Sequence, residues 1–419
     1  MKRIRDPIYG YVEVDDEALK LVDNPFFQRL RYIRQNGLAY LVFPSATHSR
    51  FEHSLGAYHV ASLMVRKIKA SNVVDLEALK RIALLHDIGH LPFSHTFEWS
   101  LEILKYMDKS KYDELWKKIV EPTLKSGGKE AREPAKFHEH MGIFVVRECM
   151  KREDIADKLW NVYVAKKSPV EMSVVSSTLD ADRLDYLQRD SYYFGVKYGL
   201  IPLDRLLEVM EINEDGKYVF DSKGRDDLEH FLIARYHMYN AVYNHSVVMI
   251  MNSVMAFTIA KMVSDGVIGL EMITDCDKLL HFTDDYVLMK LKESKDKNDC
   301  AHLYDAIYKR KKYKKFIIED QYADSFKSLY KKRRDEITKF TIENDGKLVV
   351  TESETEASVD NVVLRLRTSG GVQHIDLGEV SDPSKYVNVP KPRYKIVIGY
   401  SEEKVFEEFR RQYLSTVLG

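Results

Sequence analysis

The sequence predicts a mainly α-helical fold in which a large helical core carries a small α+β appendage at the C-terminus. From about residue 15 to 340, apolar residues recur at the spacing of amphipathic helices. Beyond residue 338 the pattern changes to short strand-like segments, separated by Gly370-Gly371 and Asp382-Pro383. The 419 residues, 45% of them hydrophobic, are enough for a large core and for more than one domain. We therefore predict a helical domain over residues 1–337 and an α+β domain over residues 338–419.

The individual elements follow from these patterns. Helical periodicity covers Phe51–Lys69, Leu76–His86, Ser94–Met107, His138–Met150, Leu179–Arg189, Asp226–Val263 and Tyr304–Lys309. Strands are predicted at Lys347–Thr351, Asn361–Arg367, Gln373–Leu377 and Tyr394–Tyr400, and a final helix at Glu402–Leu414. Asp215-Gly216 predicts a hairpin turn, and the glycine-rich segment Ser126–Glu130 predicts a mobile loop.

Composition narrows the class of protein. A formal net charge of -1 gives no general attraction to nucleic acid or to membranes. Cys149, Cys276 and Cys300 are odd in number and far apart, which predicts no disulfide framework and a reducing compartment. The N-terminus lacks the apolar core of a signal peptide, and polar residues interrupt the most hydrophobic stretch, Ser246–Met262. We expect a cytoplasmic protein in which that stretch is a buried helix and does not cross a membrane.

The segment His86-Asp87-Ile88-Gly89-His90 holds the clearest chemical signal. Leu79, Ile82 and His86 fall at i, i+3 and i+7, so His86 lies on the core-facing stripe of its helix. Two imidazoles and a carboxylate within one turn suit a divalent transition metal. An isolated His-Asp pair is more often a buried histidine with a hydrogen-bonded carboxylate, so further ligands must decide between the two interpretations.

Two flanking segments hold further ligand candidates. His53 lies at the start of one predicted helix and Asp182 on another. With His86 and Asp87 they would give four nitrogen and oxygen donors, which leave open positions on a six-coordinate metal for water and substrate. Iron, manganese, magnesium, nickel and zinc all suit parts of this divalent-metal donor set.

Several ordered blocks point to one family: Asp6–Gly10, Phe27–Gln35, Phe43–Gly56, His86–His95 and Asp180–Asp190. They resemble the HD-domain phosphohydrolase superfamily, and within it the deoxynucleoside triphosphate (dNTP) triphosphohydrolases of the branch that contains the human sterile-alpha-motif and HD-domain protein. The similarity covers most of residues 1–265. It implies an HD-domain helical core whose metal ligands are His53, His86, Asp87 and Asp182.

A second set of histidines predicts acid–base chemistry. Ser94 is predicted to cap a helix that carries His95 and Glu98 at i and i+3, on one face. A carboxylate beside an imidazole fixes its orientation and stabilises its protonated form, as a general acid near neutral pH requires. The resemblance implies that His95 protonates the leaving 5′-oxygen and that His90 and His138 line the same site.

Two helices offer candidates for substrate contact. On each, three polar residues fall at i, i+4 and i+8 and share a face: Asp182, Tyr186 and Asp190 on one, and Arg235, Tyr239 and Tyr243 on the other. Arginine suits phosphate oxygens, and tyrosine offers a ring and a hydroxyl for a sugar. A tyrosine-rich core helix with a surface arginine is the alternative on these residues alone. The resemblance implies triphosphate contacts from Arg50, Arg183 and Arg235, and deoxyribose contacts from Gln35, Tyr186, Asp190 and Tyr243.

Three positions depart from the related human enzyme. Asn36, Tyr239 and Asn244 stand where that enzyme has leucine, histidine and glutamine. A polar amide at Asn36 is able to hydrogen-bond a 2′-hydroxyl. The base preference of the related enzyme, and its discrimination against ribonucleotides, therefore cannot be assigned to this chain from the resemblance.

Regulation and partners rest on weaker signals. Asp23, Gln28 and Arg31 match positions that bind an activating guanine nucleotide in that branch, and are equally typical of a polar helix face. The basic runs Lys309–Lys315 and Lys331–Arg334 are typical of single-stranded nucleic-acid contacts and, more often, of solvated helix faces. Relatives commonly form dimers or tetramers, so we expect a homo-oligomer.

The sequence thus predicts a metal-dependent hydrolase that cleaves a dNTP into a deoxynucleoside and inorganic triphosphate. Two alternatives stay open: an HD phosphohydrolase for another nucleotide, such as a ribonucleotide, an alarmone or a cyclic nucleotide, and a single-stranded nucleic-acid-binding protein.

Overall fold

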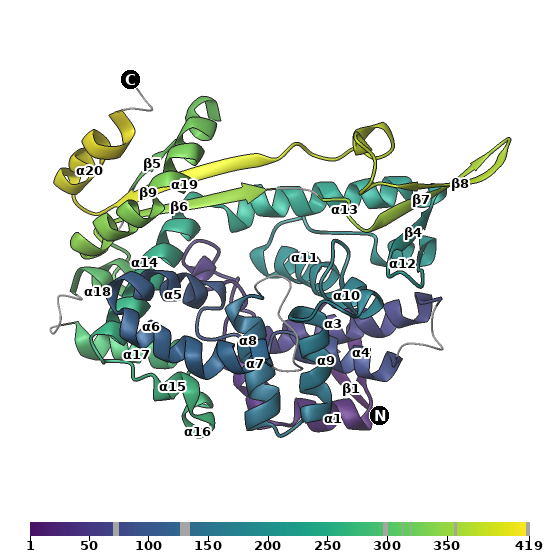
Figure 1. Ribbon diagram of the computed structural model, residues 1–419, viewed down its shortest axis with the longest axis horizontal. Coiled ribbons are helices and arrows are strands. Elements are labelled where there is room, and N and C mark those ends of the chain that lie inside the picture. Colours follow the sequence, from purple (N-terminus) through teal and green to yellow (C-terminus); the bar gives the residue numbers. More distant parts are fainter. Residues whose placement is uncertain are drawn as a thin grey trace.

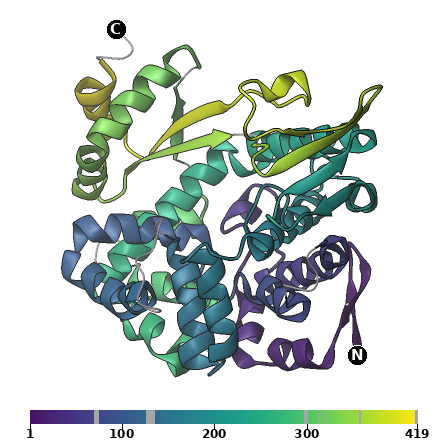
Figure 2. The same ribbon diagram turned by 45° about the vertical axis from the view of Figure 1, so that its right-hand side comes forward.

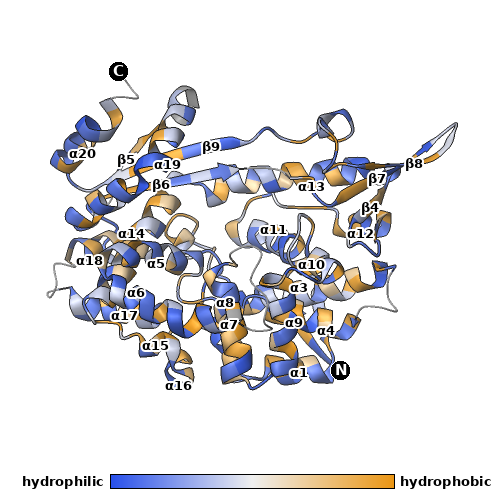
Figure 3. Ribbon diagram, viewed as in Figure 1, coloured by the Kyte–Doolittle hydropathy of each residue, from blue (hydrophilic) through white to orange (hydrophobic). Residues whose placement is uncertain are grey.

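The computed structural model describes residues 1–69, 75–125, 135–295, 301–311, 313–318, 320–355 and 358–415. It confirms a mainly helical protein with small sheets, the largest of which lie along one side of the helical body (Figure 1). Hydrophobic and hydrophilic residues alternate along most helices, as expected for amphipathic helices packed around a core (Figure 3). The predicted loop Ser126–Glu130 lies outside the described residues.

The first part of the chain supplies a hairpin and the helices that carry the histidines. It comprises β1 (Lys2–Asp6), β2 (Gly10–Val14), α1 (Asp16–Val22), α2 (Pro25–Gln28), α3 (Arg50–Met64), α4 (Leu76–Leu85), α5 (His95–Met107), α6 (Lys109–Leu115), α7 (Glu121–Lys125), α8 (Phe137–Phe144), α9 (Glu153–Tyr163), α10 (Pro169–Val175) and α11 (Ala181–Phe194). The β1–β2 hairpin was not predicted, because β1 is mostly exposed and lacks an apolar alternation.

The second part adds more helices and both larger sheets. It comprises α12 (Leu203–Val209), β3 (Met210–Ile212), β4 (Tyr218–Asp221), α13 (Arg225–Met238), α14 (Ser246–Ser264), α15 (Glu271–Thr274), α16 (Cys276–Leu279), α17 (Asp284–Ser294), α18 (Ala301–Tyr308), β5 (Lys314–Ile317), α19 (Asp320–Glu343), β6 (Leu348–Thr355), β7 (Val362–Thr368), β8 (Gly371–Asp376), β9 (Arg393–Tyr400) and α20 (Glu403–Phe409).

Helix α14 is the centre of the core. Its side chains are largely buried, and it packs against α5 and, at its other contacts, against α17, α18 and β6. By length and composition alone it is the one described helix that is able to cross a membrane, but 78% of that window is buried inside the protein. The prediction of a buried helix is confirmed. The predicted continuous helix Asp226–Val263 is instead broken at Asn244-His245, between a π-helical turn and α14.

Both larger sheets combine strands from distant parts of the chain. The order β3-β4-β7-β8 places β4 parallel to β7, with Tyr218 opposite Val362. The order β5-β9-β6 is antiparallel throughout, with Leu348 opposite Tyr400. In Figure 2 the strands of both sheets lie above the helical body. The proposed boundary after residue 337 falls within α19 and stays a prediction.

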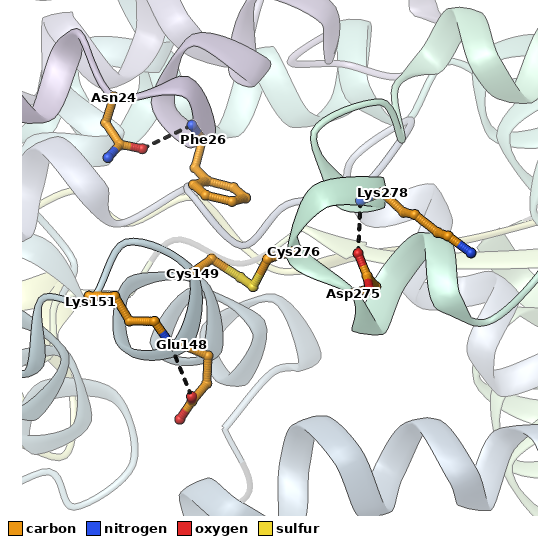
Figure 4. Close-up of a disulfide and its surroundings, with 8 residues drawn as sticks. All are labelled: Asn24, Phe26, Glu148, Cys149, Lys151, Asp275, Cys276 and Lys278. Atoms are coloured by element: carbon orange, nitrogen blue, oxygen red, sulfur yellow. Dashed lines mark hydrogen bonds and ion pairs between the residues drawn. A yellow bond between two sulfur atoms is a disulfide. The ribbon is translucent and has the colours of Figure 1, made fainter.

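A disulfide corrects the expectation from cysteine spacing. Cys149 and Cys276 are bonded, with Sγ atoms 2.01 Å apart, although 127 residues separate them in the chain. The bond joins the π-helical turn Val145–Cys149 that follows α8 to the start of α16 (Figure 4). The expectation of no disulfide was wrong because pairing depends on proximity in the fold, which spacing along the chain does not reveal.

Thiol counting tests this bond directly. Alkylation of the denatured protein without reductant should modify one cysteine, because Cys149 and Cys276 are bonded, and all three should react after reduction, as intact mass reports. Three modified cysteines without reductant, in protein kept in air, would contradict the disulfide and favour the original expectation.

Candidate active site

Four donor side chains from three parts of the chain converge at one point. His53 projects from α3, His86 and Asp87 follow the end of α4, and Asp182 lies in the first turn of α11. The Nε2 atom of His53 lies 3.2 Å from Nε2 of His86 and 2.9 Å from Oδ1 of Asp182. Asp87 completes the group, with carboxylate oxygens 3.5 Å from Nε2 of His53 and 3.4 Å from Nε2 of His86.

These separations fit a bound divalent cation. Neighbouring ligands of an octahedral metal with bonds of roughly 2.1 Å lie about 3 Å apart, close to the distances in this cluster. Two imidazole nitrogens and two carboxylates are also a donor set that such metals use. His53, His86, Asp87 and Asp182 are therefore the residues that would hold the metal.

A further layer of partners fixes the orientation of both imidazoles. Nδ1 of His53 lies 2.8 Å from the Asp185 carboxylate, and Nδ1 of His86 lies 2.8 Å from the Ala83 carbonyl. Both partners only accept hydrogen bonds, so each Nδ1 carries a proton and each Nε2 faces the cluster. Asp185 itself accepts hydrogen bonds from Nε and Nη2 of the buried Arg189.

The charges of the cluster shift its pKa values in opposite directions. Burial on its own would lower the pKa of His53, but hydrogen bonds with Asp182 and Asp185 raise it to about 10. Burial on its own would raise the pKa of Asp182, but hydrogen bonds with His53 and His86 lower it well below its usual value. Without a cation the imidazoles therefore bind protons tightly, and the carboxylates stay ionised.

Gly56 allows the close approach of α3 and α11. A Cβ atom at this position would lie 1.9 Å from Oδ1 of Asp185 and 2.3 Å from a guanidinium nitrogen of Arg189. Only glycine at this position leaves room for Asp185, which contacts His53, and for Arg189.

A second cluster contains two histidines joined by one carboxylate. Glu98 lies 2.8 Å from Nδ1 of His95 and 2.8 Å from Nδ1 of His138, and it also accepts the backbone N–H of His138. Burial on its own would raise the pKa of Glu98, but His138 and His95 lower it far below its usual range. An ionised Glu98 orients both imidazoles, and its charge opposes the lowering of the His95 pKa that burial causes.

His90 links the two clusters. Its ring stacks on that of His138 at a centroid distance of 4.0 Å, and its Nε2 lies 3.2 Å from Asp87. Burial, Arg50 and His138 together lower the pKa of His90 well below its usual value. His90 is therefore neutral near pH 7. The pKa of His95 is also lowered, because burial outweighs the opposing charge of Glu98.

Both clusters open into one cavity of about 530 Å³. Most of the sequence-predicted residues line it: Gln35, Asn36, Arg50, His86, Asp87, His90, His95, Glu98, His138, Asp182, Arg183, Tyr186, Asp190, Tyr239 and Tyr243. His53 lies buried beneath the cavity wall, and Arg235 places its guanidinium over the ring of Tyr239 at 5.7 Å.

The arginines differ in how fully they are paired. Arg50 donates to the Ser94 hydroxyl, to Asp87 and to the Gln35 carbonyl. Arg183 pairs with Asp180, yet its buried Nε has no hydrogen-bond partner, and the same is true of Nε of Arg235. Buried donors without acceptors are costly, so these two atoms point to an anionic ligand.

Asp190 organises the opposite wall. Its carboxylate accepts hydrogen bonds from Tyr243 at 2.6 Å and from the Asn36 amide at 2.9 Å, and it lies 2.6 Å from Nε2 of His48. Sequence reasoning assigned no role to His48, although it lies in a block that carried the family resemblance. The amide nitrogen of Asn36 is thus occupied by Asp190.

Three predicted regulatory residues lie away from the cavity. Asp23 is exposed at the end of α1. Gln28 accepts a hydrogen bond from Arg31 at 2.8 Å, and the Arg31 guanidinium lies over the ring of Phe51.

One local prediction was wrong. Ser94 precedes α5, but its side chain makes no capping bond. Its hydroxyl instead donates to the Arg34 carbonyl and accepts from Arg50. Ser94 therefore joins the segment before α5 to the backbone of Arg34 and to the side chain of Arg50.

Comparison with known families agrees with this geometry. The HD domain matches residues 50–190, and the HD associated region matches residues 201–382. The chain belongs to the HD-domain phosphohydrolase family, and the resemblance seen in the sequence motifs is confirmed.

Several individual proteins are similar to this chain. An uncharacterized protein of Methanocaldococcus jannaschii is 34% identical over 299 residues, which are 70% of this chain and 57% of that protein. The deoxynucleoside triphosphate triphosphohydrolase SAMHD1 homolog of Dictyostelium discoideum is 30% identical over 260 residues, 59% of this chain and 46% of that protein. The crystal structure of a hypothetical protein from Aquifex aeolicus is 30% identical, with a TM-score of 0.65 over 98% of this chain and 99% of that one. The chain spans about half the length of the curated relatives it matches.

Metal binding should be coupled to proton release. A cation must displace the protons that the raised pKa values of His53 and His86 retain, so Mn²⁺ affinity should rise with pH between about 6 and 8, by up to about tenfold per pH unit for each displaced proton. Titration calorimetry in buffers of different ionisation enthalpy measures both quantities.

The matched variants for this titration are Asp182→Asn, which should lose the site, and Asp226→Asn, an exposed helical carboxylate that should change nothing. Affinity that is independent of pH, with no proton release, would show that these imidazoles do not bind the cation.

Proposed function

We propose that the protein is a metal-dependent dNTP triphosphohydrolase. The observation that carries this proposal is that one cavity lies against the metal cluster and is lined by a carboxylate-linked pair of histidines and by Arg183, whose buried Nε has no partner. Relatives named as deoxynucleoside triphosphate triphosphohydrolases, 30–32% identical over part of their length, support the same substrate class.

Each part of the cavity would meet one part of the substrate. Arg183 and Arg235 have buried Nε donors that suit phosphate oxygens, and Arg50 lines the cavity where it donates to Asp87. Tyr186, Tyr243 and Asp190 form the neighbouring wall, where hydroxyl and carboxylate groups suit a sugar. The triphosphate would therefore lie toward the arginines and the sugar toward Asp190.

The chemistry would divide between the two clusters. When bound, the divalent cation would supply Lewis-acid stabilisation and lower the pKa of water. A water oxygen attacks the α-phosphorus and releases a proton to solvent, the bond between that phosphorus and the 5′-oxygen breaks, and His95 gives its proton to the departing oxygen. Glu98 orients His95 and stabilises its charged form before transfer. The products are a deoxynucleoside and inorganic triphosphate.

Preference for the deoxy sugar is part of the proposal. Asn36 donates one N–H of its amide to Asp190, so that N–H is not free for a 2′-hydroxyl. The side-chain oxygen of Gln35 is buried without a donor and is a candidate acceptor for a sugar hydroxyl. The other phosphohydrolase alternative, a ribonucleotide substrate, is tested in the same assay.

The nucleic-acid alternative receives little support from the basic runs. Lys309 pairs with Asp305 at 2.8 Å, and Lys314 pairs with Glu403 at 2.7 Å. Arg333 and Arg334 likewise pair with glutamates, and Lys312 lies outside the described residues. Four of the ten basic residues in these runs thus have a carboxylate partner.

Chromatographic analysis of products from each dNTP and NTP, with Mn²⁺, Mg²⁺ or Fe²⁺, tests the proposal. We expect triphosphate and a deoxynucleoside as the first products, with slower turnover of ribonucleotides. Orthophosphate or pyrophosphate as the first product would contradict the cleavage position, and equal turnover of NTPs would contradict the sugar preference.

The role of His95 has its own test. His95→Gln should lower kcat by about 10²–10³-fold, the range for loss of a general acid, with little change in Mn²⁺ affinity. The exposed His237→Gln variant on α13 is the matched control and should keep full activity. Equal activity of both variants would remove His95 from the mechanism.

Activation by a guanine nucleotide through Asp23, Gln28 and Arg31, homo-oligomer assembly and a cytoplasmic location are further proposals. GTP or dGTP added to a single dNTP should raise turnover if those residues form an activator site. Unchanged turnover would end that proposal without affecting the catalytic one.

A further inference from the structure

The loop that carries the reactive histidines has a strained backbone. Residues 86–94 connect α4 to α5 and place His86, Asp87 and His90 in the site, with His95 immediately after them. Phe93 and Ser94 have φ angles of 60° and 59°, in the left-handed region that residues other than glycine rarely adopt. Such a conformation persists only where surrounding contacts hold it.

One of those contacts is a buried carboxylate from outside the HD domain. Asp284 is the first residue of α17, and its side chain is buried. Its Oδ1 accepts the backbone N–H of Phe93 at 2.7 Å. Its Oδ2 accepts the backbone N–H of Arg34 at 3.0 Å and a guanidinium N–H of the same residue at 3.3 Å. One carboxylate thus joins the catalytic loop to the segment that leads into Gln35.

A buried guanidinium donates hydrogen bonds to backbone carbonyls of the same loop. Arg29 donates to the carbonyl of His90 at 2.8 Å and to that of Ile88 at 3.1 Å. Its other terminal nitrogen donates to the carbonyl of Phe282, two residues before Asp284, at 3.3 Å. Burial lowers the pKa of Arg29 to about 10 while Asp284 opposes that shift, so Arg29 is cationic at neutral pH.

The two charges act on complementary backbone groups. Asp284 accepts from the N–H of Phe93 at the end of the loop, and Arg29 donates to carbonyl groups in its middle. Burial raises the pKa of Asp284 to about 6, so the accepting carboxylate form prevails above neutral pH. Charge-assisted hydrogen bonds of this kind are stronger than neutral ones.

We propose that Asp284 and Arg29 are positioning residues, which clamp the backbone of residues 88–93 and so set the position of His90 and His95 relative to the metal cluster. Asp284 lies in the region matched by the HD associated region, so that region would contribute to the catalytic geometry as well as to the cavity wall. The kinetic consequence rests on the proposed function, whereas the structural consequence does not.

The test compares Asp284→Asn with Asp285→Asn. The amide keeps the shape of Asp284 but turns one acceptor into a donor that faces a backbone N–H, whereas Asp285 is the exposed neighbour on the same helix. We expect Asp284→Asn to lower kcat for dNTP hydrolysis by about tenfold or more, with KM within about twofold. Mn²⁺ affinity should stay unchanged, and Asp285→Asn should match the wild type.

Hydrogen–deuterium exchange supplies a readout that needs no substrate. Peptides that contain Phe93 or Arg34 should exchange about tenfold faster in Asp284→Asn, while peptides from α9 and β9 keep wild-type rates. Uniformly faster exchange would indicate a general loss of stability and would overturn the positioning role. Exchange and kcat equal to those of Asp285→Asn would also overturn it.

Arg29→Lys is the second variant, because it keeps the buried charge but loses the fork that joins the loop carbonyls to the carbonyl of Phe282. It should give the same local increase in exchange around His90. If both variants fail to fold, these residues support the whole fold and the clamp is refuted. If the wild type hydrolyses no dNTP, the proposed function fails, while the exchange results still decide the clamp.

Discussion

The structure depends on a network of buried charges at the junction of α3, α4 and α11. Asp182, Asp185 and Asp87 meet His53 and His86 there, and Arg50 and Arg189 balance the remaining negative charge. An ionised carboxylate buried without a partner costs several kcal/mol, so each of these groups requires the others. The same network explains why α3 carries glycine at position 56 and why the N-terminal hairpin reaches Arg189 through Asp6.

Both halves of the chain contribute residues that line the cavity. The HD domain supplies the metal donors and the reactive histidines. Helix α13 and the turn that follows it supply Tyr239 and Tyr243, and α17 supplies the carboxylate that holds the histidine loop. The disulfide ties the segment after α8, the helix that carries His138, to α16, which lies just before α17. The associated region therefore lines the cavity and contacts the loop that carries the histidines.

Much of the site could be predicted because its residues lie at recognisable helical spacings within short segments. Helical spacing placed His86 on a buried face, and the i, i+3 and i+4 relations brought His95 near Glu98 and Asp182 near Tyr186. The supporting residues gave no such signal. Arg189 meets Asp6 across 183 positions, and Asp284 meets Phe93 across 191. Such pairs, like the disulfide and the β1–β2 hairpin, exist only once the chain has folded, and no periodicity encodes them.

The most direct test of the central claim is anomalous diffraction from crystals grown with Mn²⁺. The account predicts one strong peak within about 2.0–2.3 Å of Nε2 of His53, Nε2 of His86 and a carboxylate oxygen each of Asp87 and Asp182, with open positions toward the cavity. A peak held by other residues, or no peak while these side chains point apart, would contradict it.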